Sequence, residues 1–546
     1  MAIMSKMSLT LCMLLCQFAT LLASSSSSNN SSTDTICNLT PYPTFCKSNS
    51  PSNVQRGDIH EYGSFYSNKS LSSSRDLLSL VSTYLQSPSK FSHSTILALQ
   101  DCHLLLDLNI DFWTNTLQTI DNSTTLTSSQ AETVLTMISA TLTNLDTCLD
   151  SLNQATSSSP DNDLVSSISN GTIYSSISLA LFKQGWASST ATPQSRKLLS
   201  ERNDAYLWEQ RLYEIIRKRG RKLLQSAPDG VVVNQTVVVN PDGSGNYTTI
   251  TDAVAAAPNN TGGTKGFFVI YVVAGVYEEY VSIPKYKQYL MMIGDGINQT
   301  IITGNHSAGT NYTTFNSYSF AVVAQGFVAM NITFRNTAGA SNFQAVALRS
   351  GADLSAFYNC SFEGYQDTLY THSMRQFYRN CDIYGTIDFI FGNAAVVLQN
   401  CNILPRLPMS GQYNTITAQG RTDINQNTGT SIHNCTITAA TNLGTTKTYL
   451  GRPWKQYSRT VYMQSFMDSL IDPAGWAEWS GTLYLDTLYY AEYNNSGPGS
   501  NTSNRVTWSG YHIINATDAE TFTVSNFISG GVWLPRTGVP YFLDLI

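Results

Sequence analysis

The sequence predicts two folded parts of different class, an all-α four-helix bundle followed by an all-β, right-handed parallel β-helix. Three observations predict this division of the 546 residues. Apolar residues recur at helical spacing between about residues 70 and 185. From about residue 235 the chain changes to short β-branched and aromatic runs between turn residues. Within that second part a motif built on asparagine recurs, which is typical of a solenoid.

The first 24 residues have the composition of a secretory signal peptide. Lys6 precedes an apolar stretch over residues 9–23, and small residues follow it. The stretch is too short to span a membrane, and no later stretch reaches 18 consecutive apolar residues. We therefore expect residues 1–24 to be removed, a Ser/Asn-rich leader to follow over residues 24–34, and the protein to be secreted with no membrane anchor.

Residues 25–195 form the predicted helical domain. Four amphipathic segments are separated by gaps rich in Ser, Asn, Asp and Pro, which suits an antiparallel bundle with short connections. The domain also carries an even number of cysteines, as expected when disulfides form within one part of a secreted protein. These are Cys37, Cys46, Cys102 and Cys148.

Residues 196–224 form a basic joint between two parts that carry little charge. The joint contains Arg196-Lys197-Leu198-Leu199 and, near its end, Arg221-Lys222-Leu223-Leu224. A solvated helix would explain the charges. The interpretation we favour is proteolytic processing, because an exposed basic linker is a place where cleavage is tolerated.

Residues 225–546 form the predicted β-helix. An Asn-X-X-apolar motif recurs about every 20 to 34 residues, as expected for stacked coils with loops of different length. The motif begins at Asn331, Asn359, Asn380, Asn400 and Asn434. This part also contains four cysteines, of which Cys360 and Cys381 stand at equivalent positions one coil apart, so their redox state stays open.

The same register stacks two aspartates. Asp367 and Asp388 are 21 residues apart, as are Gly364 and Gly385, so each aspartate occupies the same place in its coil. Adjacent strands lie about 4.8 Å apart, and two carboxylates that close do not both ionise readily. One could act as an acid and the other as a nucleophile or base. Alternatively, both residues could cap turns of the solenoid.

Composition excludes several classes of function. Charged residues make up only 12% of the chain and the net charge is −6, so no nucleic-acid partner is expected outside the basic joint. The histidines show no metal-ligand spacing, and HExxH and CxxC motifs are absent. The sequence also lacks the G-x-S-x-G motif, which carries the serine nucleophile of esterases with the α/β-hydrolase fold. We expect no cofactor and no metal.

Four segments around the aspartates carry a family resemblance. They are Gln344-Ala-Val-Ala-Leu348, Gly364-Tyr-Gln-Asp-Thr-Leu-Tyr370, Gly385-Thr-Ile-Asp-Phe-Ile-Phe-Gly-Asn-Ala394 and Tyr449-Leu-Gly-Arg-Pro-Trp454. Together they resemble plant pectin methylesterases (pectinesterases), and the likeness covers nearly all of the second part. Cys37-Asn-Leu-Thr-Pro-Tyr-Pro-Thr-Phe-Cys46 and Ala98-Leu-Gln-Asp-Cys102 resemble a pectin methylesterase inhibitor domain. The whole chain is thus similar to a proenzyme with both modules.

The resemblance implies a role for each matching residue. Asp388 would be the nucleophile that attacks the C6 methyl ester of homogalacturonan, and Asp367 the general acid and base. Gln344 and Gln366 would form the oxyanion hole, and Arg452 would hold the nucleophile. The residues expected at the sugar are Trp454, Gln344, Arg452, Thr314 and Phe391.

The resemblance also implies disulfides and partners. Cys37–Cys46, Cys102–Cys148 and Cys401–Cys435 are the expected bridges. The expected partners are methyl-esterified pectin, an inhibitor protein and a processing protease at the basic joint. The protein is expected to be monomeric and to act in the plant cell wall, with the N-terminal domain inhibiting the enzyme or assisting its folding until removal.

Two other functions remain open at this stage. A pectin-cleaving glycosidase on the same solenoid would also use two carboxylates about 5 Å apart. The glutamine pair argues against it, since amide donors suit an oxyanion and not the cation of a glycosidase transition state. The second alternative is an inhibitor or binding protein that acts through the N-terminal domain.

Overall fold

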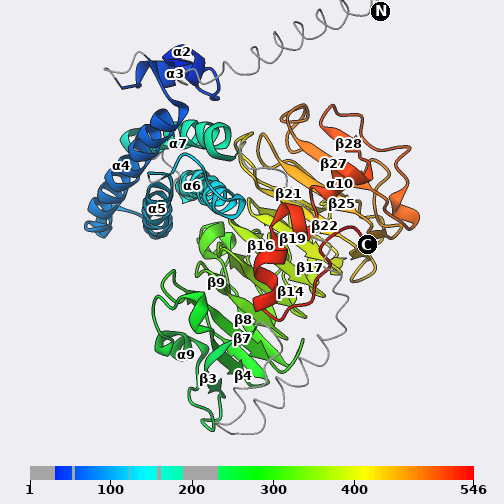
Figure 1. The fold of residues 1–546 in the computed structure, drawn as a ribbon. Coiled ribbons are helices and arrows are strands. Elements are labelled where there is room, and N and C mark those ends of the chain that lie inside the picture. Colours follow the sequence, from blue (N-terminus) through cyan, green and yellow to red (C-terminus); the bar gives the residue numbers. More distant parts are fainter. Residues whose placement is uncertain (1–30, 52–55, 122, 156–161, 188–230) are drawn as a thin grey trace, which may run out of the picture.

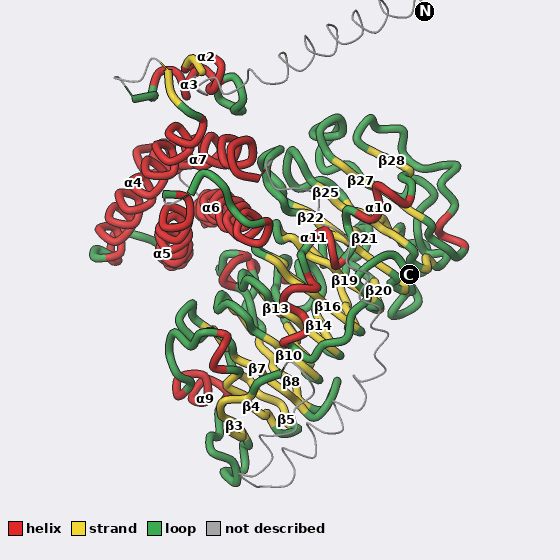
Figure 2. The backbone as a smooth tube through the Cα atoms, viewed as in Figure 1, coloured by secondary structure: helices red, strands yellow, loops and turns green. Residues whose placement is uncertain are grey.

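The computed structural model describes residues 31–546 apart from 52–55, 122, 156–161 and 188–230. The expected signal peptide, most of the Ser/Asn-rich leader and the basic joint at 196–224 lie outside the described residues. Figures 1 and 2 show the helical part beside an elongated stack of strands. The two predicted fold classes are confirmed.

The helical part is a four-helix bundle. Its helices are α4 (Ile59–Leu85), α5 (His93–Ile120), α6 (Ser128–Ala155) and α7 (Asn162–Phe182). Helix α4 begins at a capping box, in which the Asp58 side chain accepts from the first turn and Glu61 accepts the Asp58 N–H. The predicted apolar positions, such as Leu77, Leu145 and Ile168, are buried between the helices.

Two disulfides fasten this bundle. Before α4 the chain forms a short pair of helices, α2 (Thr33–Cys37) and α3 (Pro43–Ser48), which Cys37–Cys46 links. Cys102–Cys148 joins α5 to α6. Both pairs are those that the family resemblance implied.

The β part is a parallel β-helix with three sheets along its length. The eleven-stranded sheet contains, in spatial order, β28 (Tyr511–Ile513), β27 (Tyr489–Tyr493), β25 (Arg459–Met463), β22 (Gly429–His433), β19 (Ala395–Gln399), β16 (Arg375–Arg379), β13 (Ser355–Tyr358), β10 (Val328–Met330), β7 (Leu290–Gly294), β4 (Phe267–Val272) and β3 (Val233–Val239). The eight-stranded sheet contains β26 (Phe466–Met467), β23 (Thr436–Ile437), β20 (Asn402–Pro405), β17 (Asp382–Gly385), β14 (Ser361–Glu363), β11 (Thr333–Asn336), β8 (Thr300–Gly304) and β5 (Gly275–Glu278). The seven-stranded sheet contains β24 (Thr448–Gly451), β21 (Asn414–Gln419), β18 (Ile390–Gly392), β15 (Leu369–Thr371), β12 (Leu348–Ser350), β9 (Phe320–Val322) and β6 (Val281–Ile283).

The recurring asparagines turn the chain between two of these sheets. All five have a positive φ, a conformation that asparagine tolerates better than most residues. Their side chains also bond from coil to coil: Asn359 donates to Asn331 at 2.5 Å, and Asn434 donates to Asn400 at 2.9 Å. The asparagine motif therefore marks the corner of each coil, which explains its recurrence.

The expected Cys401–Cys435 disulfide is wrong, because both residues are thiols in the structure. The strand register places Cys360, Cys381, Cys401 and Cys435 at equivalent positions of successive coils. Equivalent side chains on parallel strands point the same way, whereas a disulfide needs two Cβ atoms that turn toward each other. Each thiol instead donates to a backbone carbonyl, as Cys435 does to Leu398 at 3.3 Å.

The bundle packs against the seven-stranded sheet. Leu145 and Leu152 of α6 belong to one apolar cluster with Phe315, Tyr370 and Phe391 of the β part. In Figure 1 the end of α6 lies against the middle coils of the β-helix. The structure thus places the helical domain over one face of the solenoid.

Candidate active site

The two aspartates lie side by side on the covered face. Asp367 lies two residues before the start of β15 and Asp388 two residues before the start of β18. The pairing of Leu369 with Ile390 puts the aspartates at equivalent positions. Both adopt a positive φ, of 61° and 53°, and both are buried. This confirms their predicted stacking one coil apart and argues against two unrelated turn caps.

Asp388 is held by three hydrogen bonds that suit an ionised carboxylate. Arg452 donates from Nε to Oδ1 at 2.8 Å and from its terminal nitrogen to Oδ2 at 2.6 Å. Thr415 donates its hydroxyl to Oδ1 at 2.6 Å and accepts the Asp388 backbone N–H at 2.9 Å. Bidentate guanidinium pairing fixes both the charge and the orientation of the carboxylate.

Asp367 has a different environment. Burial raises the pKa of Asp367 well above its usual value, and the neighbouring charge of Asp388 raises it further, against a smaller lowering by Arg452. The neutral acid is therefore the favoured form of Asp367. The pair divides into one carboxylate and one carboxylic acid, the division that acid-assisted nucleophilic attack requires.

Gln344 and Gln366 lie beside this pair. The N–H of Ala345 donates to the Gln366 carbonyl at 3.2 Å, which places Gln344 one coil before Gln366. Both side chains are partly exposed. Within the described ranges neither amide side chain bonds to another protein group, so both N–H₂ groups are available to a substrate oxygen.

An aromatic surface adjoins the aspartates. Trp454 lies against Gly420, where an added Cβ would come within 2.7 Å of the indole. Phe391 stacks on Tyr370 with ring centroids 4.1 Å apart and lies 6.0 Å from Trp454. Phe391 and Trp454 were predicted from the sequence, and the structure brings them together.

Thr314 is in contact with the helical domain. It begins the short helical turn Thr314–Asn316, and both its N–H and its hydroxyl donate to Gln154 of α6, at 3.0 and 3.2 Å. The structure therefore places the predicted Thr314 at the covered end of the same face.

Comparisons with known proteins identify the family of this chain. Residues 236–531, more than half of the chain, match the Pectinesterase family. The chain belongs to the pectinesterase family. It is thus a carboxylic ester hydrolase, and its residues 31–181 match the Plant invertase/pectin methylesterase inhibitor family. No helix in the described part of this pectinesterase is long and apolar enough to cross a membrane.

Several relatives share one or both parts. The "Probable pectinesterase/pectinesterase inhibitor 20" of Arabidopsis thaliana is 53% identical over 94% of each chain. "Pectinesterase 2" of Citrus sinensis is 60% identical over 60% of this chain and 63% of its own. Among solved structures, "Pectin methylesterase from Carrot" is 54% identical with a TM-score of 0.56. It is matched over its whole length by 59% of this chain.

Sequence reasoning missed two residues around Asp388. One is Thr415 and the other is Trp479, whose ring lies 4.4 Å from the Arg452 guanidinium. The register of Ile390 with Thr417 puts Thr415 directly over Asp388. Aligning that coil would have found it, but the longer loop between β20 and β21 breaks the spacing that revealed the two aspartates.

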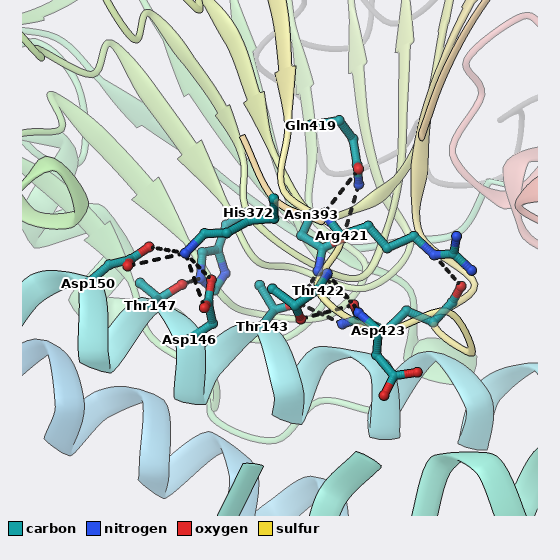
Figure 3. A network of polar contacts seen from close by, with 12 residues as sticks. Thr143, Asp146, Thr147, Asp150, His372, Asn393, Gln419, Arg421, Thr422 and Asp423 are labelled. Carbon is teal, nitrogen blue, oxygen red and sulfur yellow. Dashed lines mark hydrogen bonds and ion pairs between the residues drawn. The ribbon is translucent and has the colours of Figure 1, made fainter. Parts of the chain in front are cut away.

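The inhibitor-like bundle also makes polar contacts along α6 with the face that carries the two aspartates. Thr147 bonds His372 at 3.0 Å, and Asn393 donates to Thr143 at 2.9 Å. Figure 3 shows Thr143, Asp146, Thr147 and Asp150 on one face of this helix, turned toward the strands. The bundle therefore contacts both the apolar and the polar side chains on this face of the β-helix.

Proposed function

We propose that this pectinesterase removes the C6 methyl esters of homogalacturonan and releases methanol, with Asp388 as the nucleophile. The observation that carries the proposal is the contrast between neighbouring aspartates. Asp388 is paired with Arg452, while burial favours the neutral form of Asp367. A bound ester would then meet a nucleophile and a proton donor together.

The reaction takes place in two steps. A carboxylate oxygen of Asp388 attacks the ester carbonyl carbon, and the intermediate expels methoxide, which takes the Asp367 proton and leaves as methanol. The resulting anhydride joins Asp388 to the sugar carboxyl. Asp367 then takes a proton from water, whose oxygen attacks the sugar carbonyl. This breaks the anhydride and restores Asp388 and the protonated Asp367.

Gln344 and Gln366 bind the oxyanion in this scheme. Their amide N–H groups are unused by the protein and lie on the two coils that precede the coil of the nucleophile, so they would donate to the carbonyl oxygen as it becomes negative. Trp454 and Phe391 offer flat apolar surface to sugar rings. Arg452 keeps Asp388 ionised and in place.

We propose further that the inhibitor-like bundle restrains the enzyme until cleavage in the basic joint at residues 196–224. The support is its position, because Thr314 and Phe391 both contact or adjoin α6. The signal-like composition of residues 1–24 supports secretion to the plant cell wall. We place the bundle at 25–195 and the β-helix domain at 225–546.

Methanol and reducing ends released from highly methylated pectin test the proposal. Intact protein, protein cut in the basic joint and an Asp388→Asn variant of the cut protein should be compared. We expect methanol without new reducing ends from the cut protein, much less from the intact protein, and none from the variant.

Asp382→Asn is a matched control, since Asp382 lies one strand away and bonds Asn402 instead of a catalytic group. It should keep full activity. New reducing ends would indicate a glycosidase, and absence of any product would favour a binding function. Equal activity of intact and cut protein would exclude restraint by the bundle.

A further inference from the structure

Lys455 is a cation of the β-helix that the helical domain neutralises. It follows Trp454, its ammonium lies 5.2 Å from that ring, and its side chain is 17% exposed. Its partners are Asp146 and Asp150 of α6, each at 2.9 Å. Burial opposes the charge of Lys455, but the two carboxylates outweigh it and raise its pKa. Figure 3 shows both aspartates with their dashed contacts.

The counter-ions of Lys455 come only from the bundle, as far as the described residues show. From residue 231 onward, no described carboxylate of the β part lies within ion-pair distance of its ammonium. The nearby Arg452 is already committed to Asp388. Removal of the bundle therefore leaves a cation beside the sugar-facing Trp454 with no anion of its own, a situation that favours binding of an external anion.

Lys285 repeats this arrangement at the other end of the sheet. It follows β6 and pairs with Asp107 and Asp111 of α5, at 2.8 and 2.6 Å. In both cases the bundle presents two aspartates one helical turn apart to a single lysine. Two different helices of the bundle thus each place a pair of aspartates against a lysine, one pair at each end of the sheet.

The two lysines lie on either side of the aspartates along the sheet. Strand β24, before Lys455, is two strands from β18, and β6, before Lys285, is three strands from β15. At about 4.8 Å between strands, these separations are about 10 Å and 14 Å. A polymer lying along the sheet with one ester at Asp388 would pass both lysines.

We propose that Lys455, and at the far end Lys285, bind unesterified carboxylates of galacturonate units that flank the ester being hydrolysed. The acidic pairs of α5 and α6 occupy these positions in the uncut protein in place of the substrate carboxylates. The inference rests on the proposed function and names a feature of its substrate. A methyl ester is neutral and cannot form an ion pair with a lysine. The two lysines would therefore distinguish de-esterified galacturonate units from methyl-esterified ones.

The local charge matters because the domain as a whole is acidic. Acidic residues outnumber basic ones in residues 225–546, so overall electrostatics repel a polyanion. Lys455 and Lys285 would supply local attraction where the substrate passes. Partly de-esterified pectin is then the better substrate, and fully de-esterified product is an inhibitor.

The test uses full-length protein with a specific protease site inserted in the basic joint, cut and freed of its bundle. The two measurements are kcat/KM for methanol release from fully and partly methylated oligogalacturonides, and the inhibition constant of unesterified oligogalacturonate. The variants are Lys455→Met, which removes the charge, and Lys455→Arg, which keeps it. Lys265→Met is the matched control, because Lys265 is exposed and distant in the chain.

We expect Lys455→Met to lower the ratio of kcat/KM for partly over fully methylated substrate about tenfold, as loss of one charged hydrogen bond implies. The inhibition constant should rise by a similar factor, while Lys455→Arg restores both and Lys265→Met changes neither. An unchanged ratio and inhibition constant in Lys455→Met would overturn the inference. Absence of methanol from the unmodified cut protein would instead contradict the proposed function.

Discussion

At the scale of single residues, the site depends on how two identical side chains acquire different properties. Asp367 and Asp388 share a backbone conformation and a place in the coil. Their neighbours differ, because Arg452 and Thr415 bond Asp388. Burial acts on Asp367 without such compensation. The chemistry therefore follows from the next coils, which supply the arginine and the threonine.

Replacing Thr415 by valine should slow the reaction. Valine has nearly the same shape but cannot donate to Asp388, and a hydrogen bond to a charged group contributes about 1.5–3 kcal/mol. We expect kcat of the cut protein to fall about 10- to 100-fold, measured as methanol release. Thr417→Val is the control, since Thr417 donates to the Leu450 carbonyl instead. A kcat equal to that of the unmodified enzyme would show that Thr415 is not needed.

The Asp388→Asn variant should lower the pKa of Asp367. The charge of Asp388 raises the Asp367 pKa in the native pair, and the neutral amide removes that contribution. The carboxyl band of Asp367 can be followed by infrared difference spectroscopy against an Asp388→Asn/Asp367→Asn double variant. A titration of Asp367 that moves to higher pH, or does not move, would contradict the proposed coupling.

At the scale of elements, successive coils carry the same residue types at equivalent positions. Asparagines with positive φ turn the corner, and inward cysteines stack into a row that packs in the core. The sequence repeat shows that the cysteines are stacked, but it does not show whether they form disulfides. Parallel Cβ directions keep the four cysteines as thiols even where a family resemblance implied a bridge.

Thiol titration tests this row. All four cysteines of the β part are buried and unbonded, so a small aromatic disulfide reagent should find no reactive thiol in the folded, cut protein. After unfolding without reductant, it should find four thiols per β-helix domain. Two thiols after unfolding would instead indicate a bridge such as Cys401–Cys435.

At the scale of the whole molecule, the two domains meet through carboxylates of the bundle. Asp101 of α5 accepts from Thr313 at 2.6 Å and also bonds Asn316, with Arg349 nearby. Burial raises the pKa of Asp101 to about 7. Burial and Asp150 raise the pKa of Asp146 to about 6. A detached bundle would expose both groups, whose usual pKa is near 4.

Docking of the cut bundle should therefore weaken as pH rises. The docked state has the higher pKa values, so it binds protons that the separated state releases. Its stabilisation is complete below about pH 4 and is lost as the pH passes about 6 to 7. Gel filtration of the cut protein should show more separated bundle at pH 8 than at pH 5. Asp101→Asn should flatten this dependence, and stronger docking at pH 8 would contradict the prediction.

The sequence by itself determined the two fold classes, the coil register and the stacking of the two aspartates. Each of these depends on local periodicity, and a repeat of about 20 residues is enough to place Asp367 over Asp388. The tertiary structure alone decided what surrounds them. Thr415 over Asp388, the open Cys401–Cys435 pair and the ion pairs of Lys455 all depend on loops of variable length or on packing between domains. Neither leaves a periodic signal, because such contacts join residues at unrelated distances along the chain.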